Sequence, residues 1–261
     1  MAYEDIIYEK WDGVATITIN RPEVLNAFRT QTVLEMTEAV VDAARDGSIG
    51  AIVLTASGER AFCVGGDIKE MGDLTSESGR LFVGRFARLL WEIRRAPKPV
   101  IAAVRGYCLG GGNEINVACD VTIATEDSIF GQVGPTVGSA PVIGAAQFLP
   151  RIVGEKRARE IIFLCQRYSA QEAESFGWVN KVVPKERFEG ELRAWTDRIL
   201  ELSPQALRVS KISLNYESDQ LYGSFNSSIE MISALYGTEE FREGMTAFLE
   251  KRKPDFKRFR R

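Results

Sequence analysis

Short apolar runs alternate with amphipathic stretches over roughly the first 150 residues of the chain. Wholly apolar runs predict strands of a sheet that is covered on both faces, and helical spacing of apolar residues predicts amphipathic helices between them. The predicted strands span residues 3–9, 14–19, 49–55, 100–104 and 121–124, and the predicted helices span residues 26–45 and 82–95. This alternation predicts an α/β core.

From Gly154 onward the chain has mainly helical spacing. The predicted helices span residues 158–164, 170–176, 188–202, 204–218, 220–236 and 238–251, with one short strand at 179–184. Residues 72–79 are polar and predict a loop, and a second loop, rich in Gly and small residues, runs to Gly144. We therefore expect a core over residues 1–200 and a helical lobe over residues 201–261.

Composition narrows the class of protein. The chain has 261 residues, of which 45% are hydrophobic, and a net charge of -3, which argues against a general attraction to nucleic acid. No apolar run approaches a membrane span, and Met1-Ala2-Tyr3-Glu4-Asp5 does not resemble a signal peptide. The four cysteines form no C-x-x-C pair and are predicted to be reduced. These features predict a cytoplasmic protein.

Histidine is absent from the sequence. A Ser-His-Asp triad, a Cys-His pair and every histidine-ligated metal site are therefore excluded, and we expect no metal. Proton transfer must rely on Asp, Glu, Tyr, Lys, Cys or bound water.

Two glycine turns follow predicted strands. Gly65-Gly66 precedes a helix-like segment, and Gly110-Gly111-Gly112 is followed at once by Asn113 and Glu114. Two backbone N–H donors brought to one point would form an oxyanion hole, although glycines required only for tight packing would give the same pattern. The dinucleotide pattern G-x-G-x-x-G and the P-loop are both absent, so neither a nucleotide cofactor nor phosphoryl transfer is supported.

In their order along the chain, several motifs resemble the crotonase (enoyl-CoA hydratase/isomerase) superfamily across essentially its whole length. The matching segments are Ile19-Asn20-Arg21-Pro22, Asn26-Ala27, residues 61–69, residues 99–102, residues 106–114, Cys119-Asp120, Phe130-Gly131-Gln132 and residues 149–154. The resemblance implies a ClpP-like spiral of strand–strand–helix turns with a C-terminal helical lobe that assembles a homotrimer or hexamer. It also implies an acyl-CoA substrate, no permanent cofactor, and an oxyanion hole formed by the N–H groups of Gly66 and Gly111.

The same resemblance implies residues that contact coenzyme A. They are Asn26, Ala27, Arg29, Val64, Asp67, Ile68, Lys69, Tyr107, Leu109, Gly110, Gly134 and Lys251. For Arg29, a solvated helix charge is an equally good interpretation. Asp120 is expected to be structural, paired with nearby backbone or an arginine.

Hydratases of this superfamily use two glutamates. The first matches Glu114, but Gly134 stands at the position of the second, so ordinary water addition is in doubt. One glutamate can still transfer a proton, as in an isomerase or a lyase. Alternatively, Glu114 could simply stabilise the helix dipole, by typically 0.3–1 kcal/mol.

Other segments resemble the branch of 1,4-dihydroxy-2-naphthoyl-CoA synthase and 2-ketocyclohexanecarboxyl-CoA hydrolase. They are residues 130–139, 154–160 and 250–256. The site serine and tyrosine of that branch match Ser139 and Tyr236, and its glycine matches Gly134, where bound bicarbonate can serve as the base. The branch has Asp where this chain has Pro141, and usually an apolar residue at Glu114. Ser139 could instead cap a turn, and Tyr236 could be a core aromatic residue.

The sequence therefore favours an acyl-CoA lyase, hydratase or hydrolase that forms or cleaves a C–C bond in a cyclic or β-oxo acyl-CoA, by ring closure or ring-opening hydrolysis. An enoyl-CoA hydratase or isomerase using Glu114 alone is the alternative. The basic tail, residues 251–261, suggests a further hypothesis, a non-catalytic or RNA-binding protein, but the acidic net charge argues against nucleic acid as a partner. No membrane partner is expected.

Overall fold

Two sheets form the centre of the computed structural model, which describes residues 3–260. Met1, Ala2 and Arg261, the last residue of the basic tail, lie outside the described residues. The larger sheet has the order β1-β2-β3-β5-β7-β10, and the smaller has the order β4-β6-β8-β9. Only β1 with β2 and β8 with β9 pair antiparallel. The other neighbours are parallel, as expected where helices connect successive strands.

The strands of the larger sheet are β1 (Ile6–Trp11), β2 (Val14–Ile19), β3 (Ala51–Ala56), β5 (Val100–Val104), β7 (Val121–Thr125) and β10 (Lys181–Val183). Those of the smaller sheet are β4 (Ala61–Cys63), β6 (Tyr107–Leu109), β8 (Ile129–Gly131) and β9 (Tyr168–Ser169). All of β5 and nearly all of β3 are buried, which agrees with the prediction of a sheet covered on both faces.

The helices of the first half are α1 (Thr30–Arg45), α2 (Ile68–Gly72), α3 (Ser76–Arg95), α4 (Gly111–Ala118) and α5 (Ala145–Val153). Those that follow are α6 (Glu155–Leu164), α7 (Ala170–Ser175), α8 (Phe188–Leu200), α9 (Pro204–Asp219), α10 (Tyr222–Ser233) and α11 (Glu239–Leu249). Single 3-10 turns occur at η1 (Pro22–Val24), η2 (Gly134–Val137), η3 (Lys185–Arg187) and η4 (Phe256–Phe259).

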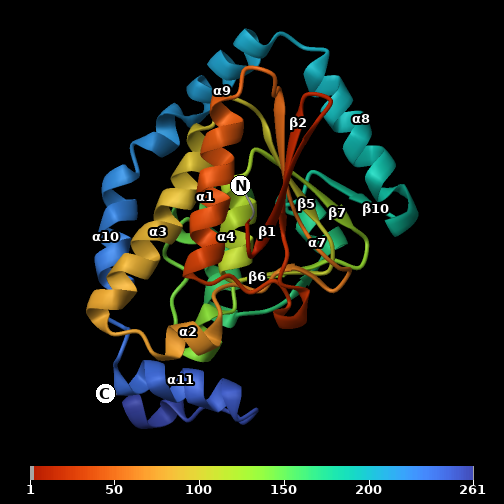
Figure 1. Ribbon diagram of the computed structural model, residues 1–261. Helices are drawn as coiled ribbons and strands as arrows, with labels where there is room; N and C mark the ends of the chain where they lie inside the picture. Colours follow the sequence, from red (N-terminus) through yellow and green to blue (C-terminus); the bar gives the residue numbers. More distant parts are fainter. Residues whose placement is uncertain (1–2, 261) are drawn as a thin grey trace.

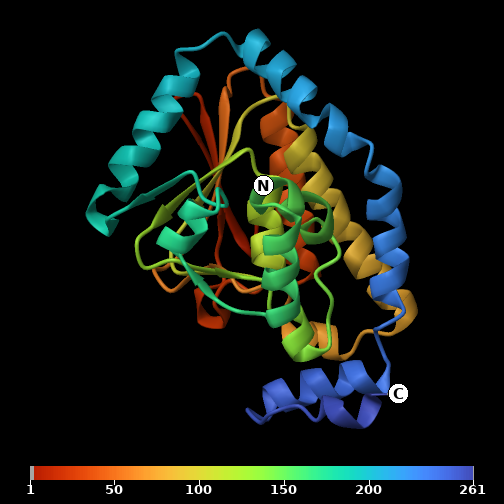
Figure 2. The same cartoon turned by 180° about the vertical axis from the view of Figure 1, so that it is seen from behind.

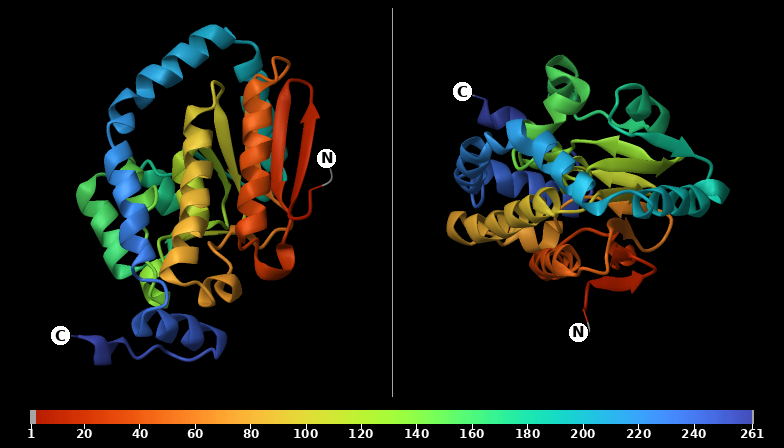
Figure 3. Two further views of the ribbon diagram at one scale, coloured as in Figure 1. Left: turned by 60° about the vertical axis from the view of Figure 1, so that its left-hand side comes forward. Right: turned by 90° about the horizontal axis from the view of Figure 1, so that it is seen from above.

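Helices α1 and α3 lie side by side on the larger sheet, and α10 packs along α3 (Figure 1). Seen from behind and from the side, α9 and α10 form an arch over α1 and α3 (Figures 2 and 3). In the same views α11 lies apart from the sheets, beneath α2. α11 contacts α2 and η2, so the end of the chain reaches the loops that follow the smaller sheet. No helix among the described residues is long and apolar enough to cross a membrane.

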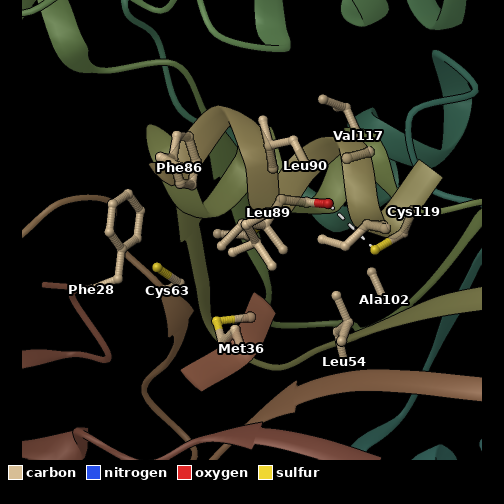
Figure 4. Packing of buried hydrophobic residues seen from close by; sticks show 14 of the residues in the cluster. Phe28, Met36, Leu54, Cys63, Phe86, Leu89, Leu90, Ala102, Val117 and Cys119 are labelled. Atoms are coloured by element: carbon tan, nitrogen blue, oxygen red, sulfur yellow. Dashed lines mark hydrogen bonds between the residues drawn. The ribbon is translucent and has the colours of Figure 1, made fainter. Parts of the chain in front are cut away.

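The main core lies between α1, α3, α4 and the sheets, and Figure 4 shows part of it. Phe28 and Phe86 face one another at its margin, with Cys63 beside Phe28. Further inside, Leu89, Leu90 and Leu54 are fully buried. The aromatic pair at the margin becomes important below because one side of it borders a cavity.

The predicted α/β class and strand–helix spiral are confirmed, whereas several boundaries were wrong. α3 begins at Ser76 rather than 82, because the Thr75 hydroxyl accepts a hydrogen bond from Ser78 N (3.2 Å) and Ser78 Oγ accepts one from Thr75 N (2.9 Å). The helix predicted from residue 26 begins at Thr30. α5 was not predicted, and it contains Pro150, a residue that normally argues against a helix interior. The division of the chain at residue 200 stays a prediction.

Candidate active site

The two glycine turns meet because their strands, β4 and β6, are parallel neighbours. Gly65 has φ 101° and Gly110 has φ 54° with ψ -123°, conformations that side chains other than glycine rarely adopt. A Cβ atom at Gly65 would lie only 3.1 Å from Gly111 N. These glycines therefore let the two turns touch, and they place Gly66 and Gly111 beside one cavity.

The N–H groups of Gly66 and Gly111 donate no hydrogen bond to any described residue. Phe28 holds the first turn in place, because its N–H donates to Gly65 O (2.9 Å) and its O accepts from Asp67 N (2.8 Å). Gly111 is the first residue of α4, where backbone N–H groups lack partners within the helix. The pair is thus available to a developing negative oxygen, as an oxyanion hole requires.

The cavity has a volume of about 70 Å³ and is walled mostly by apolar side chains. Its lining comprises Phe28, Gly66, Met71, Phe82, Val83, Phe86, Gly111, Glu114, Ser139, Ala140, Ile143, Ile232 and Tyr236. All five residues predicted to be catalytic are in this set, together with side chains from α2, α3, α4 and α10. Among the described residues, the only ionisable side chains on the lining are those of Glu114 and Tyr236.

Three phenylalanines form one wall of the cavity. The rings of Phe28 and Phe86 stack with centroids 4.6 Å apart, and the ring of Phe82 lies 6.1 Å from that of Phe28. Gly111 makes room for this wall, since a Cβ atom there would lie 2.6 Å from Phe28 Cε1. Figure 4 shows the facing rings of Phe28 and Phe86. The aromatic wall therefore packs directly against the turn that carries one of the two N–H donors.

Glu114 lies in the first turn of α4, and its side chain is buried. Its Oε1 atom has no hydrogen-bond partner among the described residues. Burial raises the pKa of this carboxyl well above its usual value, while the backbone N–H groups of Ala145 and Ile143, at the start of α5, act in the opposite direction. Burial is the larger effect, so this site favours the neutral carboxyl more than water does, and the neutral form can donate a proton.

Tyr236 follows α10 and is 4% exposed. Its ring packs edge-on against Phe241, with centroids 4.9 Å apart, and it covers Gly79 so closely that a Cβ atom there would overlap the ring. Burial, and to a lesser degree the charge of Glu114, raises the pKa of the Tyr236 phenol. Tyr236 is therefore both a core aromatic residue and a cavity wall, which the sequence had presented as alternatives.

Gly134 does not line the cavity. A Cβ atom there would lie 3.3 Å from Ser139 O, and Ser139 N donates a hydrogen bond to Gly134 O (3.0 Å). The space beside Gly134 is thus taken up by the backbone of Ser139. This packing gives the predicted bicarbonate no support.

None of the residues predicted to contact coenzyme A lines this cavity. The side chain of Asn26 is buried and bonds to Ser57 O (3.0 Å), Ala61 O (2.7 Å) and Arg21 N (2.9 Å), so it holds its own loop in place. Arg29 forms ion pairs with Glu4 and Asp5, an arrangement that the sequence did not predict.

The remaining predicted contacts surround the two turns or lie at the end of α11. Asp67 caps α2, accepting from Lys69 N (3.0 Å), and pairs with Arg21 (3.1 Å). Lys69 and Lys251 are exposed. The others are Ala27, Val64, Ile68, Tyr107, Leu109 and Gly110, of which Ala27 and Leu109 are buried. Their contact with coenzyme A stays a prediction.

Two further sequence expectations concern charged residues. The Asp120 carboxylate accepts hydrogen bonds from Val100 N (2.7 Å) and Lys211 Nζ (2.7 Å), so it is structural, with a lysine rather than an arginine. In the basic tail, Arg252 and Arg258 both form ion pairs with Glu243, and these pairs neutralise part of the positive charge of the tail.

Comparison with known proteins identifies relatives along nearly the whole chain. Residues 9–259 match the family model described as enoyl-CoA hydratase/isomerase. An enoyl-CoA hydratase/isomerase from Xanthobacter autotrophicus Py2 has a similar structure, with a TM-score of 0.87, 32% identity and 100% of both chains covered.

Two enoyl-CoA hydratase structures are also similar. That from Bacillus anthracis has a TM-score of 0.80 and 32% identity, and covers 97% of this chain and 99% of its own. The structure from Mycobacterium avium subsp. paratuberculosis K-10 has a TM-score of 0.89 and 28% identity, and the match covers 98% of this chain and 99% of that one.

Proposed function

The chain belongs to the enoyl-CoA hydratase/isomerase family, crotonase-type enzymes that act on acyl-CoA thioesters, and we propose that its own reaction passes through a thioester enolate held by Gly66 and Gly111. The observation that carries this proposal is the pair of N–H groups, free of partners among the described residues, at the wall of a mostly apolar cavity. In such a site, one preorganised donor contributes about 3–4 kcal/mol to stabilising the negative oxygen.

Glu114 is the proton-transfer group in this proposal. It is the only carboxyl group that residues 3–260 place on the cavity lining, and the position of the second family glutamate, Gly134, lies outside that lining. Tyr236 and Ser139 are the other groups on the lining with exchangeable side-chain protons. We propose that they orient the substrate.

The cavity volume supports a short acyl group. The cavity has a volume of about 70 Å³, and Phe28, Phe82 and Phe86 wall one side of it. A small space of this kind suits a short acyl group better than a ring. Of the cyclic and β-oxo substrates that the sequence favoured, we therefore propose C–C bond cleavage on a short, open-chain acyl-CoA.

Hydration or isomerisation of a short enoyl-CoA by Glu114 alone is the second candidate. It is favoured by the family match and by the similar structures, two of which are described as enoyl-CoA hydratases. Replacement of one of the two family carboxylates by Gly134 argues against it, because activation of water ordinarily needs a base.

The enolate itself can be tested without knowing the natural substrate. Acetoacetyl-CoA enolises readily, and an oxyanion hole should increase its enolate fraction on binding, which ultraviolet difference spectroscopy detects. We expect the amount of bound enolate to saturate with acetoacetyl-CoA concentration and to fall when butyryl-CoA is added as a competitor. Absence of both binding and enolate formation would refute the proposed function. Turnover of crotonyl-CoA would then be compared with that of 2-ketocyclohexanecarboxyl-CoA, and turnover of the ring substrate would overturn the size argument.

We also propose that the chain assembles as the trimer or hexamer that its family resemblance implies. Large apolar side chains on α9 support this, since Ile212 is 61% exposed and Leu214 is 81% exposed. Light scattering after size exclusion measures the mass directly, and a monomer would contradict the proposal.

A further inference from the structure

The cavity contains an acid but no base. Oε1 of Glu114 is buried and without a partner among the described residues, whose part of the lining includes no lysine or arginine and no second carboxylate. The backbone N–H groups of Ala145 and Ile143 partly offset this burial, but no cation balances the charged form, so the geometry favours the neutral acid. Tyr236, the only other ionisable group on the lining, is also buried and neutral.

Most routes to a thioester enolate require a base. Removal of an α-proton needs one directly, and addition of water to a double bond or to a β-oxo carbon needs one to activate the water. Loss of CO2 from a 2-carboxyacyl thioester is different, because the electron pair of the broken C–C bond itself becomes the enolate. An oxyanion hole with one neutral acid is sufficient for that reaction.

We propose that the substrate of this site is a short 2-carboxyacyl-CoA, of the malonyl or methylmalonyl type, which the protein decarboxylates. This inference rests on the proposed function, since it uses the same enolate site. It also identifies the C–C bond that is cleaved, the bond from Cα to the carboxylate carbon.

The atoms and electrons of the step balance. The Cα–carboxylate bond breaks, its electron pair forms the enolate, and CO2 leaves. The enolate oxygen receives hydrogen bonds from the N–H groups of Gly66 and Gly111. Glu114 then gives its proton to Cα, and the resulting carboxylate regains a proton from water. The net reaction consumes one proton and converts the substrate to CO2 and the acyl-CoA that is one carbon shorter.

Size and polarity of the cavity both suit this substrate. A malonyl or methylmalonyl group is short and open-chain, which suits a cavity of about 70 Å³. The wall formed by Phe28, Phe82 and Phe86 offers the carboxylate no cation. Because the charge moves from the desolvated carboxylate to the enolate oxygen, the apolar wall destabilises the ground state while the N–H groups stabilise the transition state.

The experiment incubates the full-length protein with methylmalonyl-CoA in D2O and measures CO2 release together with the mass and chirality of the propionyl-CoA formed. We expect CO2 release and one deuterium at Cα in a single configuration. Butyryl-CoA, which has no leaving carboxylate, should exchange its α-protons at least tenfold more slowly than CO2 is released, because the site has no base.

Glu114→Gln separates proton donation from bond cleavage. In this variant we expect CO2 release to fall less than about tenfold while the product becomes racemic, whereas loss of general acid–base catalysis in a hydratase or isomerase lowers the rate by about 10²–10⁴. Glu201→Gln, an exposed change on the surface beside Arg198, is the matched control and should match the wild type in both measurements.

The outcomes separate this inference from the proposed function. If acetoacetyl-CoA forms its enolate but methylmalonyl-CoA and malonyl-CoA release no CO2, decarboxylation is refuted and the enolate site stands. Rapid α-proton exchange on butyryl-CoA would also refute it, because a base would then be present. If no thioester binds, the proposed function fails as well.

Discussion

Replacement of Phe86 by alanine tests whether the aromatic wall limits the length of the acyl group. The Phe86 ring is 4% exposed, stacks on Phe28 and borders the cavity, so its removal extends the cavity toward the core. A buried methylene is stabilised by about 0.8 kcal/mol, so the two additional methylenes of hexanoyl-CoA over butyryl-CoA should gain about 1.6 kcal/mol in the variant. This corresponds to roughly a 15-fold change in relative affinity.

Isothermal titration of butyryl-CoA and hexanoyl-CoA measures this change without any turnover. We expect Phe86→Ala to shift the ratio of the two dissociation constants toward hexanoyl-CoA. Phe248→Ala, at a 57% exposed position of α11, is the control and should leave the ratio unchanged. Because a buried Phe→Ala change costs about 3–5 kcal/mol of stability, circular dichroism must first establish that the variant is folded.

A folded Phe86→Ala protein with the wild-type ratio would refute the assignment of this wall as the length limit. If the alanine variant does not fold, Phe86→Leu shortens the same side chain with less loss of packing, and the same ratio decides the question. An unchanged ratio there would also count against the assignment.

Three further predictions concern residues outside the oxyanion turns. Gly79→Ala should displace the Tyr236 ring and so weaken the binding of butyryl-CoA, which titration measures. Unchanged affinity would contradict the placement of this ring on the cavity wall. Lys211→Met should lower the free energy of unfolding in urea by about 1–3 kcal/mol, because the carbonyls of Ile93 and Lys98 and the Asp120 carboxylate lose a buried hydrogen-bond donor; a change below about 0.5 kcal/mol would contradict this. Arg252 lowers the pKa of Glu243 to about 2, so their interaction stabilises the fold above pH 4.5, the ordinary value, and is lost as the pH falls toward 2. Glu243→Gln should therefore lower the melting temperature at pH 7 but not at pH 2, and an equal decrease at both would refute the pairing.

The predictable part of the fold was the part encoded locally. Apolar runs predicted β3, β5 and β7, and helical spacing predicted most of α1 and α3, because burial of a strand or helix face leaves a periodic pattern. The start of α3 was missed because Thr75 and Ser78 were interpreted as loop residues rather than as a helix cap. α5 was missed because glycine, small residues and Pro150 weaken every local signal, whereas packing against neighbouring helices determines its conformation.

The candidate site was predictable in its polar residues and not in its apolar ones. Resemblance to the crotonase superfamily pointed to Gly66, Gly111 and Glu114, which the fold brings to one cavity. Phe28, Phe86 and Ile232 gave no such signal. Their pattern predicts burial, but a side chain that fills the core and one that borders a cavity follow the same periodicity. Their role depends on the contact between the loop before α1 and helices α3 and α10, which no local pattern specifies.

At Gly134, a contact that no local sequence pattern specifies changes the chemistry expected of the site. The sequence indicated that the second family glutamate is missing there, and it suggested that another group, such as bicarbonate, could replace it. The structure instead brings the backbone of Ser139 against Gly134, with 3.3 Å from Ser139 O to the place of a Cβ atom, and keeps Gly134 off the cavity lining. No base takes the place of that glutamate among the described residues of the lining. This missing base is the reason for proposing a substrate that generates the enolate by losing a group of its own, since the site can then stabilise the enolate and protonate it without first removing a proton.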